Sequence, residues 1–298
     1  MHNQTKLIAA AIALLFVGAS ICVKSLASVN FDFKALNAST YVTNTYEIKE
    51  NFENIKIQVD TDQIVFAPSE DGKCSVVCYE DEKEPHRIGV SGKTLSIERM
   101  HGRRLQIGLF TDSPRITVYL PEKAWGTLHI DSDTGDVDIP KDFTFESIYA
   151  ELDTGDLRVS ASAEGSVRLK TDTGHIELSD MKAEDITVTT DTGKCSLKNL
   201  RCDNLISSGD TGDLNMSGVV SSGEWNIRRS TGDVRFEDCD AETITIRTNT
   251  GDVTGTLLTE KVFLTKTDTG KTDVPKTVTG GKCDITTSTG DIRIDIAS

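Results

Sequence analysis

The sequence predicts an all-β protein, a single-domain parallel β-solenoid with about nine regular coils of 19–20 residues. Two observations carry this prediction: a Thr-Gly pair recurs at this spacing, and apolar residues keep the same register with every pair. A fixed period that extends over more than half of a chain is the mark of a repeat architecture. The glycines of the pairs are Gly135, Gly155, Gly174, Gly193, Gly212, Gly232, Gly251, Gly270 and Gly290.

Apolar and polar residues alternate on both sides of each glycine, which is typical of β-strands. In the first repeat the apolar residues are Leu128 and Ile130 before the glycine, and Val137 and Ile139 after it. A third apolar site follows seven residues after the glycine in several repeats, at Met181, Leu200, Val219, Cys239 and Leu258. Each repeat therefore predicts a strand, a tight turn, a second strand and a polar return.

The turn itself has a structural explanation. Glycine supplies a positive φ that other residues adopt only at a cost. Aspartate stands two residues before six of the glycines, as in Asp133-Thr134-Gly135, where it can accept a backbone hydrogen bond as an Asx-turn. The threonine suits a strand and can form a hydroxyl ladder along the stack. We interpret the nine glycines as structural turn residues.

The aspartates also allow a calcium hypothesis. Stacked coils about 4.8 Å apart would place acidic residues in two columns, and oxygen ligands at that density can hold Ca²⁺. The weak candidates are Asp133, Asp136, Asp153, Asp156, Asp210 and Asp213. Non-acidic residues interrupt the columns at Ser230, Asn249, Ser288, His175, Lys194 and Lys271.

Two other interpretations of the motif fit less well. An aspartic protease also contains Asp-Thr-Gly, but it needs two facing carboxylates on two lobes, which tandem copies one coil apart cannot supply. An ice-binding plane needs outward threonines on a flat face. Alternation from the apolar positions instead predicts that Thr171 and Thr173, and the equivalent pairs of other repeats, point inward.

The N-terminal residues 1–27 predict export of the chain. Residues 7–23 carry no charge, are mostly apolar, and lie between Lys6 and Lys24. This length suits either one apolar membrane-anchoring helix or a signal peptide cleaved near Ala27. The prediction is therefore an extracytoplasmic protein, tethered to the cell membrane by a single N-terminal span or secreted after cleavage.

The remaining segments divide into a linker, a cap and the repeats. Residues 28–50 are polar and predict a linker, and residues 51–125 predict irregular coils that cap the solenoid, with Asp60-Thr61-Asp62 as a decayed copy of the turn. Residues 126–298 hold the regular repeats, with a bulge predicted near Gly270. No cap is evident at the C-terminal coil, which makes it a candidate for homotypic contact.

The net charge bears on the possible partners, and the cysteine spacing bears on disulfide bonding. The formal net charge of −15 disfavours nucleic acid. The basic pairs Arg103-Arg104 and Arg228-Arg229 predict solvated faces. The seven cysteines predict free, mostly buried thiols, because those in register are several coils apart. Cys74 and Cys78 have only His86 nearby in sequence, so a metal site there is not favoured.

The chain resembles the bacterial putative-adhesin family of β-strand repeats, a domain family of unknown function. The residues that carry the likeness are Ile116-Thr117-Val118-Tyr119-Leu120-Pro121, then Leu128-His129-Ile130, then the run of Thr-Gly-Asp turns. The likeness covers about residues 50–298. It implies a surface-exposed β-solenoid, commonly tethered by one N-terminal helix, and it supplies no catalytic residues.

The sequence thus predicts a non-enzymatic surface protein with a role in adhesion, scaffolding or envelope sensing. Its partners would be the membrane, through the N-terminal segment, and an unknown cell-envelope or surface ligand. No cofactor is predicted. A carbohydrate-active β-helix enzyme is one alternative, although return segments of similar length leave no wall for a cleft. A calcium-stiffened surface spacer is the other alternative.

Overall fold

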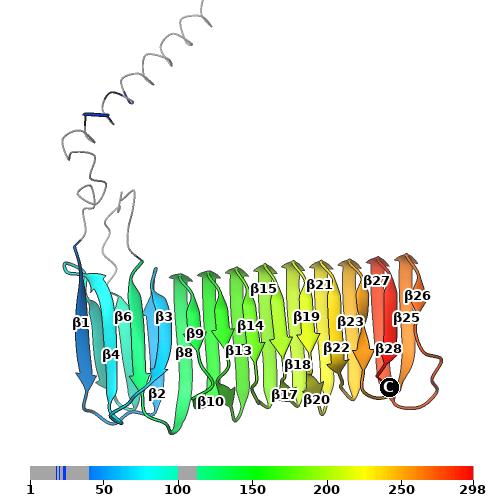
Figure 1. The fold of residues 1–298 in the computed structure, drawn as a ribbon, viewed down its shortest axis with the longest axis horizontal. Coiled ribbons are helices and arrows are strands. Elements are labelled where there is room, and N and C mark those ends of the chain that lie inside the picture. Colours follow the sequence, from blue (N-terminus) through cyan, green and yellow to red (C-terminus); the bar gives the residue numbers. More distant parts are fainter. Residues whose placement is uncertain (1–17, 19, 21–22, 25–39, 100–112, 298) are drawn as a thin grey trace, which may run out of the picture.

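The structure, a computed structural model, describes residues 18, 20, 23–24, 40–99 and 113–297. Residues 40–99 and 113–297 form a rod in which strands stack side by side along the long axis (Figure 1). No helix among the described residues is long and apolar enough to cross a membrane. Most of the predicted N-terminal helix lies outside the described residues.

Two sheets, each of 13 strands, build the rod. The first sheet, here sheet A, has the order β1 (Tyr41–Ile48), β4 (Cys74–Asp81), β7 (Arg115–Leu120), β3 (Gln63–Pro68), β9 (Val137–Ile139), β11 (Leu157–Val159), β14 (Ile176–Ser179), β16 (Cys195–Lys198), β19 (Leu214–Ser217), β22 (Val234–Cys239), β24 (Val253–Leu257), β28 (Ile292–Ile296) and β26 (Thr272–Asp273).

Sheet B has the order β25 (Lys261–Thr269), β27 (Gly281–Thr289), β23 (Thr243–Thr250), β21 (Glu224–Thr231), β18 (Asn204–Thr211), β15 (Asp185–Thr192), β13 (Ser166–Thr173), β10 (Thr144–Thr154), β8 (Ala124–Thr134), β2 (Asn54–Val59), β6 (Thr94–Arg99) and β5 (His86–Ser91). Short strands on the return side are β12 (Ser162–Ala163), which pairs with β10, and β17 (Arg201–Cys202) with β20 (Val220–Ser221).

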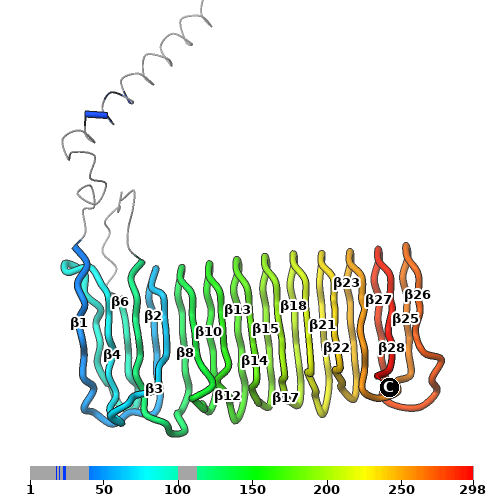
Figure 2. The backbone as a smooth tube through the Cα atoms, in the orientation of Figure 1, coloured from blue at the N-terminus to red at the C-terminus, as the bar shows by residue number. Residues whose placement is uncertain are grey.

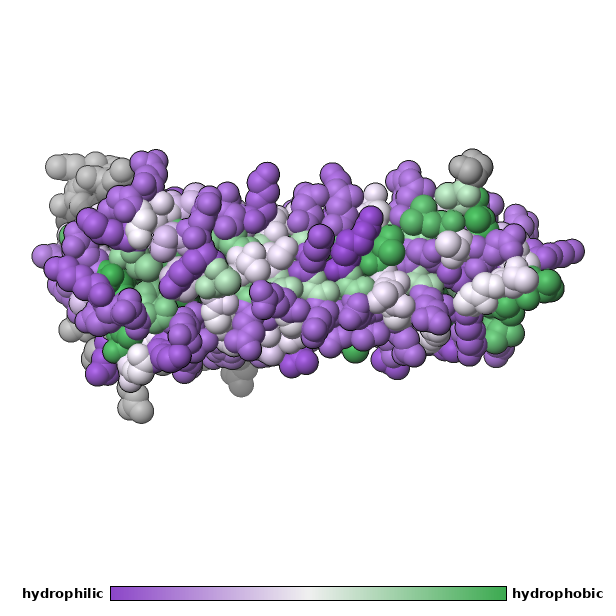
Figure 3. Space-filling view, turned by 90° about the horizontal axis from the view of Figure 1, so that it is seen from below, coloured by the Kyte–Doolittle hydropathy of each residue, from purple (hydrophilic) through white to green (hydrophobic). Residues whose placement is uncertain are grey.

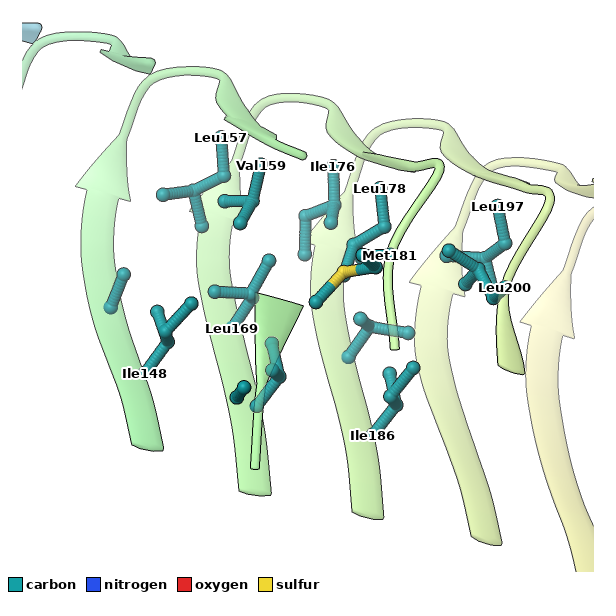
Figure 4. Packing of buried hydrophobic residues seen from close by; sticks show 14 of the residues in the cluster. Ile148, Leu157, Val159, Leu169, Ile176, Leu178, Met181, Ile186, Leu197 and Leu200 are labelled. Carbon is teal, nitrogen blue, oxygen red and sulfur yellow. The ribbon is translucent and has the colours of Figure 1, made fainter. Parts of the chain in front are cut away.

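The parallel β-solenoid is confirmed, but with about eight regular coils instead of the predicted nine or so. In each repeat the long strand before the Thr-Gly turn joins sheet B, and the short strand after it joins sheet A. The apolar columns of the two sheets meet in one continuous core (Figure 4). Ile148 and Leu169 of sheet B lie there with Leu157 and Ile176 of sheet A, and all four are fully buried. Because each coil buries its apolar face only against its neighbours, the stack is the unit of stability.

The turn glycines are required by space as well as by backbone conformation. All nine have a positive φ, and Gly193 has a φ of 150°. A Cβ built on Gly193 would lie 1.8 Å from the carbonyl oxygen of Gly174 in the neighbouring coil. Any side chain would therefore push the stacked turns apart, so glycine has a structural role at these positions.

A side-chain ladder along the turns comes from the residue after the glycine. Asp136 Oδ1 accepts the backbone N–H of Asp156 at 2.9 Å, and Asp156 Oδ1 accepts that of His175 at the same distance. Nδ1 of His175 accepts the N–H of Lys194 at 3.0 Å. These bonds join neighbouring coils, whereas the predicted Asx-turn would have used the aspartate two residues before the glycine.

The threonines of the motif face in two directions. Thr171, three residues before a turn glycine, is buried, and its hydroxyl donates to the carbonyl of Gly155 at 3.0 Å. Thr173, directly before the glycine, is exposed, as are its equivalents in all nine repeats. The prediction that both threonines point inward is therefore wrong for the second. Strand alternation stops at the aspartate between them, where the chain enters the turn.

The N-terminal cap mixes parallel and antiparallel strands. The β2–β3 coil stacks on the β8–β9 coil, and Gly135 packs against the carbonyl of Asp62, so Asp60-Thr61-Asp62 is a copy of the turn. Strands β1 and β4 run antiparallel to their neighbours and close sheet A. Strand β1 lies within residues 28–50, so the later part of the predicted linker belongs to the sheet.

The C-terminal coils do not stack in sequence order. Strand β27 pairs with β23 on one side and β25 on the other, and β28 lies between β24 and β26. Figure 2 shows this arrangement: the red β27–β28 coil lies between the preceding coils of the rod and the orange β25–β26 coil at its end. The outermost coil is therefore the one that contains Gly270, and its second strand, β26, has 2 residues.

Three local predictions are corrected. The β25–β27 pairing has no register shift, and the bulge lies instead between Phe236 and Cys239 in β22. The off-register Val262 and Leu264 simply face outward at the end of the stack. Leu258 is 44% exposed, and Leu257 takes the core position. Arg229 is buried rather than solvated, while Arg103-Arg104 lies outside the described residues.

Candidate functional site

A shallow groove on the outer face of sheet B is the candidate functional site. Its hollow has a volume of about 470 Å³, and strands β8, β10, β13 and β15 supply its walls. The residues are those that alternation turns away from the core. They are His129, Tyr149, Glu151, Arg168, Lys170, Thr187 and Thr189, with Ile130, Ala150 and Leu169 lining its floor.

Register places the most distinctive of these side chains in one row across the strands. His129 pairs with Tyr149, and Tyr149 pairs with Arg168 in the next coil. The imidazole and phenol ring centroids are 6.5 Å apart, and the guanidinium carbon of Arg168 lies 5.7 Å from the centroid of the Tyr149 ring. An arginine over an aromatic face is held by a cation–π attraction.

The hydroxyl of Tyr149 is fixed at the groove edge. It lies 3.1 Å from the Oγ atom of Ser166. Hydrogen bonding to Ser166 and Ser147 lowers the pKa of Tyr149 below its ordinary value. The ring is therefore held with one face against Arg168, and its position is set by the strand register and not by a loop.

A second row adds charge beside the aromatic one. Lys170 Nζ lies 2.7 Å from Glu151 Oε1 and 3.2 Å from Asp172 Oδ1. Hydrogen bonds to these two carboxylates raise the pKa of Lys170. Arg168, in contrast, has no ion-pair partner among the described residues, so its guanidinium charge is available to a ligand.

The groove continues along the rod into a polar section. A second hollow of about 360 Å³ shares Arg168 and Thr187 with the first. Amide and carboxylate side chains line it at Asp185, Asn204, Glu224 and Asn226. The two hollows together form an open track, with an aromatic and cationic section followed by hydrogen-bonding groups. Such a track suits an extended polar polymer better than a compact small molecule.

The sequence-predicted calcium candidates lie elsewhere, along the turns. Asp136 and Asp156 are joined by Arg158, whose Nη2 is 2.7 Å from Asp156 Oδ2 and whose Nη1 is 3.8 Å from Asp136 Oδ2. Arg235 bridges Asp213 and Asp233 in the same way. The remaining candidates, Asp133, Asp153 and Asp210, are exposed. Calcium binding stays a prediction.

The sequence analysis did not identify the groove. Its residues occupy outward positions of the repeat, where the fold accepts side chains of different polarity. No sequence motif at these positions indicates a function. One signal was present, because His129, Tyr149 and Arg168 occupy the same outward column six residues before successive turn glycines. Two aromatic rings followed by an arginine in one outward column are the part of this pattern that a search for ligand-binding residues could have used.

Solved structures of several bacterial proteins are similar to this chain in fold. Proteins named as putative adhesins from Parabacteroides merdae and Parabacteroides distasonis each align at 11% identity with a TM-score of 0.48, covering 88% of this chain and 98% of theirs. One from Bacteroides fragilis aligns at 12% identity with a TM-score of 0.42, covering 88% of this chain and 99% of its own. A comparison with curated proteins finds no match.

The family assignment comes from the sequence. The family model described as Toastrack DUF4097 matches residues 52–210 and again residues 181–298. The two matches together span residues 52–298, which include the cap strands from β2 onward and all the Thr-Gly coils. This confirms the resemblance drawn from the repeat motifs. The chain belongs to the Toastrack family, DUF4097.

Proposed function

We propose that this protein is a non-enzymatic surface adhesin that binds a polysaccharide along the groove of sheet B. The supporting observation is the row of His129, Tyr149 and Arg168, which combines aromatic faces with an uncompensated cation. Aromatic rings stack on the apolar faces of sugars, and a guanidinium pairs with carboxylates. The ligand class is therefore an acidic glycan of the envelope or of a neighbouring surface.

The shape of the site favours binding over catalysis. In the part of the chain that the structure describes, the groove is formed by strand residues without long walls, so it leaves a bound chain open to water. Glu151 is engaged by Lys170 at 2.7 Å, which leaves it unsuited to act as a catalytic acid. A carbohydrate-active enzyme would need a pair of free carboxylates on either side of the sugar.

Location follows from the N-terminal segment. We propose that residues 7–23 carry the chain out of the cytoplasm, either as a single membrane span or as a signal peptide removed near Ala27. Protease treatment of intact cells tests this location, because an extracytoplasmic rod is digested from outside. Full protection of the rod in intact cells, with digestion after lysis, would place it inside.

The binding proposal is tested with acidic and neutral oligosaccharides. Isothermal titration of the full-length chain should detect an acidic oligosaccharide, and Tyr149→Ala and Arg168→Ala should each weaken binding about tenfold or more. Arg228→Ala is the matched control, because Arg228 is exposed on β21 outside both hollows. Absence of binding to every glycan, or an equal loss in the control, would contradict the proposal.

A homotypic contact is proposed for the outermost strand, β25. Its free edge carries Val262 at 38% exposure and Leu264 at 52% exposure, and Figure 3 shows hydrophobic surface at that end of the rod. A second copy that pairs with this edge would cover both side chains. Sedimentation of the wild type and of Leu264→Lys tests this, with self-association expected only in the wild type.

A further inference from the structure

A cluster of charged and metal-ligating side chains is buried in the N-terminal cap, and none of its residues lines the groove. Cys78 and Glu80 lie on β4, His86 begins β5, and Asp62 occupies the turn between β2 and β3. Cys78, Glu80 and Asp62 have no exposed surface, and His86 is 4% exposed. Ionised groups are costly to bury unless their charges are matched.

Three donor atoms of different chemistry converge in this cluster. The Sγ atom of Cys78, a carboxylate oxygen of Glu80 and a ring nitrogen of His86 all lie within 4.8 Å of one another. Thiolate, imidazole and carboxylate are the ligands that Zn²⁺ takes in proteins. With bond lengths of about 2.0–2.3 Å, tetrahedral ligands are about 3.5 Å apart. Metal binding would therefore widen the 2.5 Å separation between His86 Nδ1 and Glu80 Oε2 and shorten the longer separations, which reach at most 4.8 Å.

The contacts of His86 divide its two ring nitrogens between different roles. Nδ1 faces Glu80 Oε2 at 2.5 Å. Nε2 lies 3.1 Å from Asp62 Oδ1, yet neither atom has a hydrogen bond of acceptable geometry. These two buried atoms therefore form a close but poorly aligned pair.

The surroundings already support a ligated histidine. Metal-bound histidines usually donate their second ring N–H to a carboxylate, which fixes the ring. Asp62 is placed for this role and is itself held by Arg99, whose Nη1 lies 3.3 Å from Asp62 Oδ2. Glu80 is oriented by Asn44 and Tyr46, which both donate to its Oε1 at 2.7 Å.

We propose that Cys78, Glu80 and His86 bind a divalent transition-metal ion of the zinc class, with Asp62 as the carboxylate partner of His86. Binding displaces the thiol proton of Cys78, and any proton on His86 Nδ1, to solvent, and no group changes its oxidation state. The Cys78 thiolate and the two carboxylates are then balanced by Arg99 and the divalent ion. A slight turn of the ring would align Nε2–H with Asp62.

The site would tie the cap together. Its ligands come from β4 and β5, and the carboxylate that supports them comes from the β2–β3 turn. The ion would therefore join the antiparallel closing strands to the first parallel coil. Since the groups are buried, the ion would enter as the cap folds.

Cobalt(II) provides the test, because a thiolate–cobalt bond gives a charge-transfer absorption in the near ultraviolet. The full-length chain, unfolded with chelator and refolded in mild detergent with Co²⁺, should bind one Co²⁺ with this absorption, and refolding with excess Zn²⁺ present should abolish the absorption. Cys78→Ser should abolish the absorption and weaken Zn²⁺ binding at least tenfold. Cys74→Ser is the matched control, being on the same strand four residues away, and should bind normally.

His86→Gln provides a second variant in which the thiol is kept, and it should weaken metal binding tenfold or more. Circular dichroism of each variant shows whether the β-rod is intact. Failure of the wild type to bind stoichiometric Co²⁺ or Zn²⁺ would overturn the proposal. So would a charge-transfer absorption that persists in Cys78→Ser, or one that His86→Gln leaves unchanged while the rod is folded.

Discussion

Arg229 lies inside the core with its Nη2 atom 2.8 Å from the hydroxyl of Ser207 in the neighbouring coil. The residue occupies the position that Thr171, Thr190 and Thr287 hold in other coils. It pairs in register with Gly209, where a Cβ would lie 2.7 Å from Arg229 Nη1. The small residues of one coil thus make room for the long side chain of the next.

This relationship predicts energetic coupling between Arg229 and Gly209. Gly209→Thr should destabilise the rod by crowding Arg229, and Arg229→Thr should destabilise it by leaving a cavity. The double variant restores the regular threonine ladder, so its loss should be smaller than the sum of the single losses by about 1–2 kcal/mol. Urea unfolding of the four proteins measures this coupling, and strictly additive losses would contradict it.

The turn glycines should be intolerant of any side chain. Gly193→Ala places a Cβ against the carbonyl of Gly174 and forces a disfavoured φ, so we expect a loss of about 3 kcal/mol or more. Gly92 is the control, because it has a φ of 61° and open space around it. Gly92→Asn should cost little. Thermal unfolding compares the two, and equal losses would show that φ alone sets the cost.

The side-chain ladder should contribute one hydrogen bond to each coil whose preceding neighbour offers an acceptor. Asp252 Oδ1 accepts the backbone N–H of Asp291 at 2.8 Å, so Asp252→Ala should cost about 1 kcal/mol. Asp252→Asn keeps an acceptor and should lose less. Lys271 ends the ladder on the outermost coil, and Lys271→Ala should be neutral. Chemical unfolding measures the stability of all three variants. If Asp252→Asn loses as much stability as Asp252→Ala, the charge of the carboxylate and not its hydrogen bond would be responsible.

The regular coils could be predicted from the sequence because every coil repeats the same pattern of apolar positions around its turn glycine. Each apolar column keeps its register with the glycine, and the structure buries those columns. Coil order was not predictable from the period alone, since Gly270 and Gly290 carry the same motif. Packing decides it: β27 places Cys283 and Ile285 in register with Ile244 and Ile246 of β23.

The irregular sequence of the outermost coil lies in its outward-facing residues. Val262 and Leu264 take outward positions on β25, whereas Phe263 and Thr265 pair in register with Cys283 and Ile285, so the off-register residues leave the core columns unbroken. The cluster around His86 was hidden for another reason. Antiparallel strands interrupt the period in the cap, so residues distant in sequence, such as Asp62 and His86, meet without a repeat to indicate it. Similarly, the groove depends on outward residues that folding does not constrain.

Acid should weaken a specific ion pair at the C-terminal end of sheet B. Burial alone would raise the pKa of Asp284, but Lys282 and Arg247 outweigh burial and hold it below its ordinary value. The Arg247 Nη2 atom lies 2.8 Å from Asp284 Oδ1. A lowered folded-state pKa stabilises the protein above the unfolded pKa of about 3.9, and this stabilisation is lost as the pH falls below it.

The matching variant is Asp284→Asn, which should cost about 1 kcal/mol near neutral pH and progressively less below about pH 4. Unfolding free energies measured over this range should therefore converge for the two proteins in acid. A difference that stays constant with pH would mean that the carboxylate acts by packing rather than by charge.

Calcium should leave the stability of the rod unchanged. The aspartates that follow the turn glycines already accept backbone N–H groups from the next coil, and Arg158 and Arg235 lie between their remaining oxygens. A bound ion would have to displace these arginines, whereas structural Ca²⁺ needs six or more free oxygen ligands. Thermal unfolding with Ca²⁺ and with chelator should give the same midpoint. A midpoint that rises with Ca²⁺ concentration would instead support a calcium-stiffened rod, because a ligand that binds only the folded state raises stability.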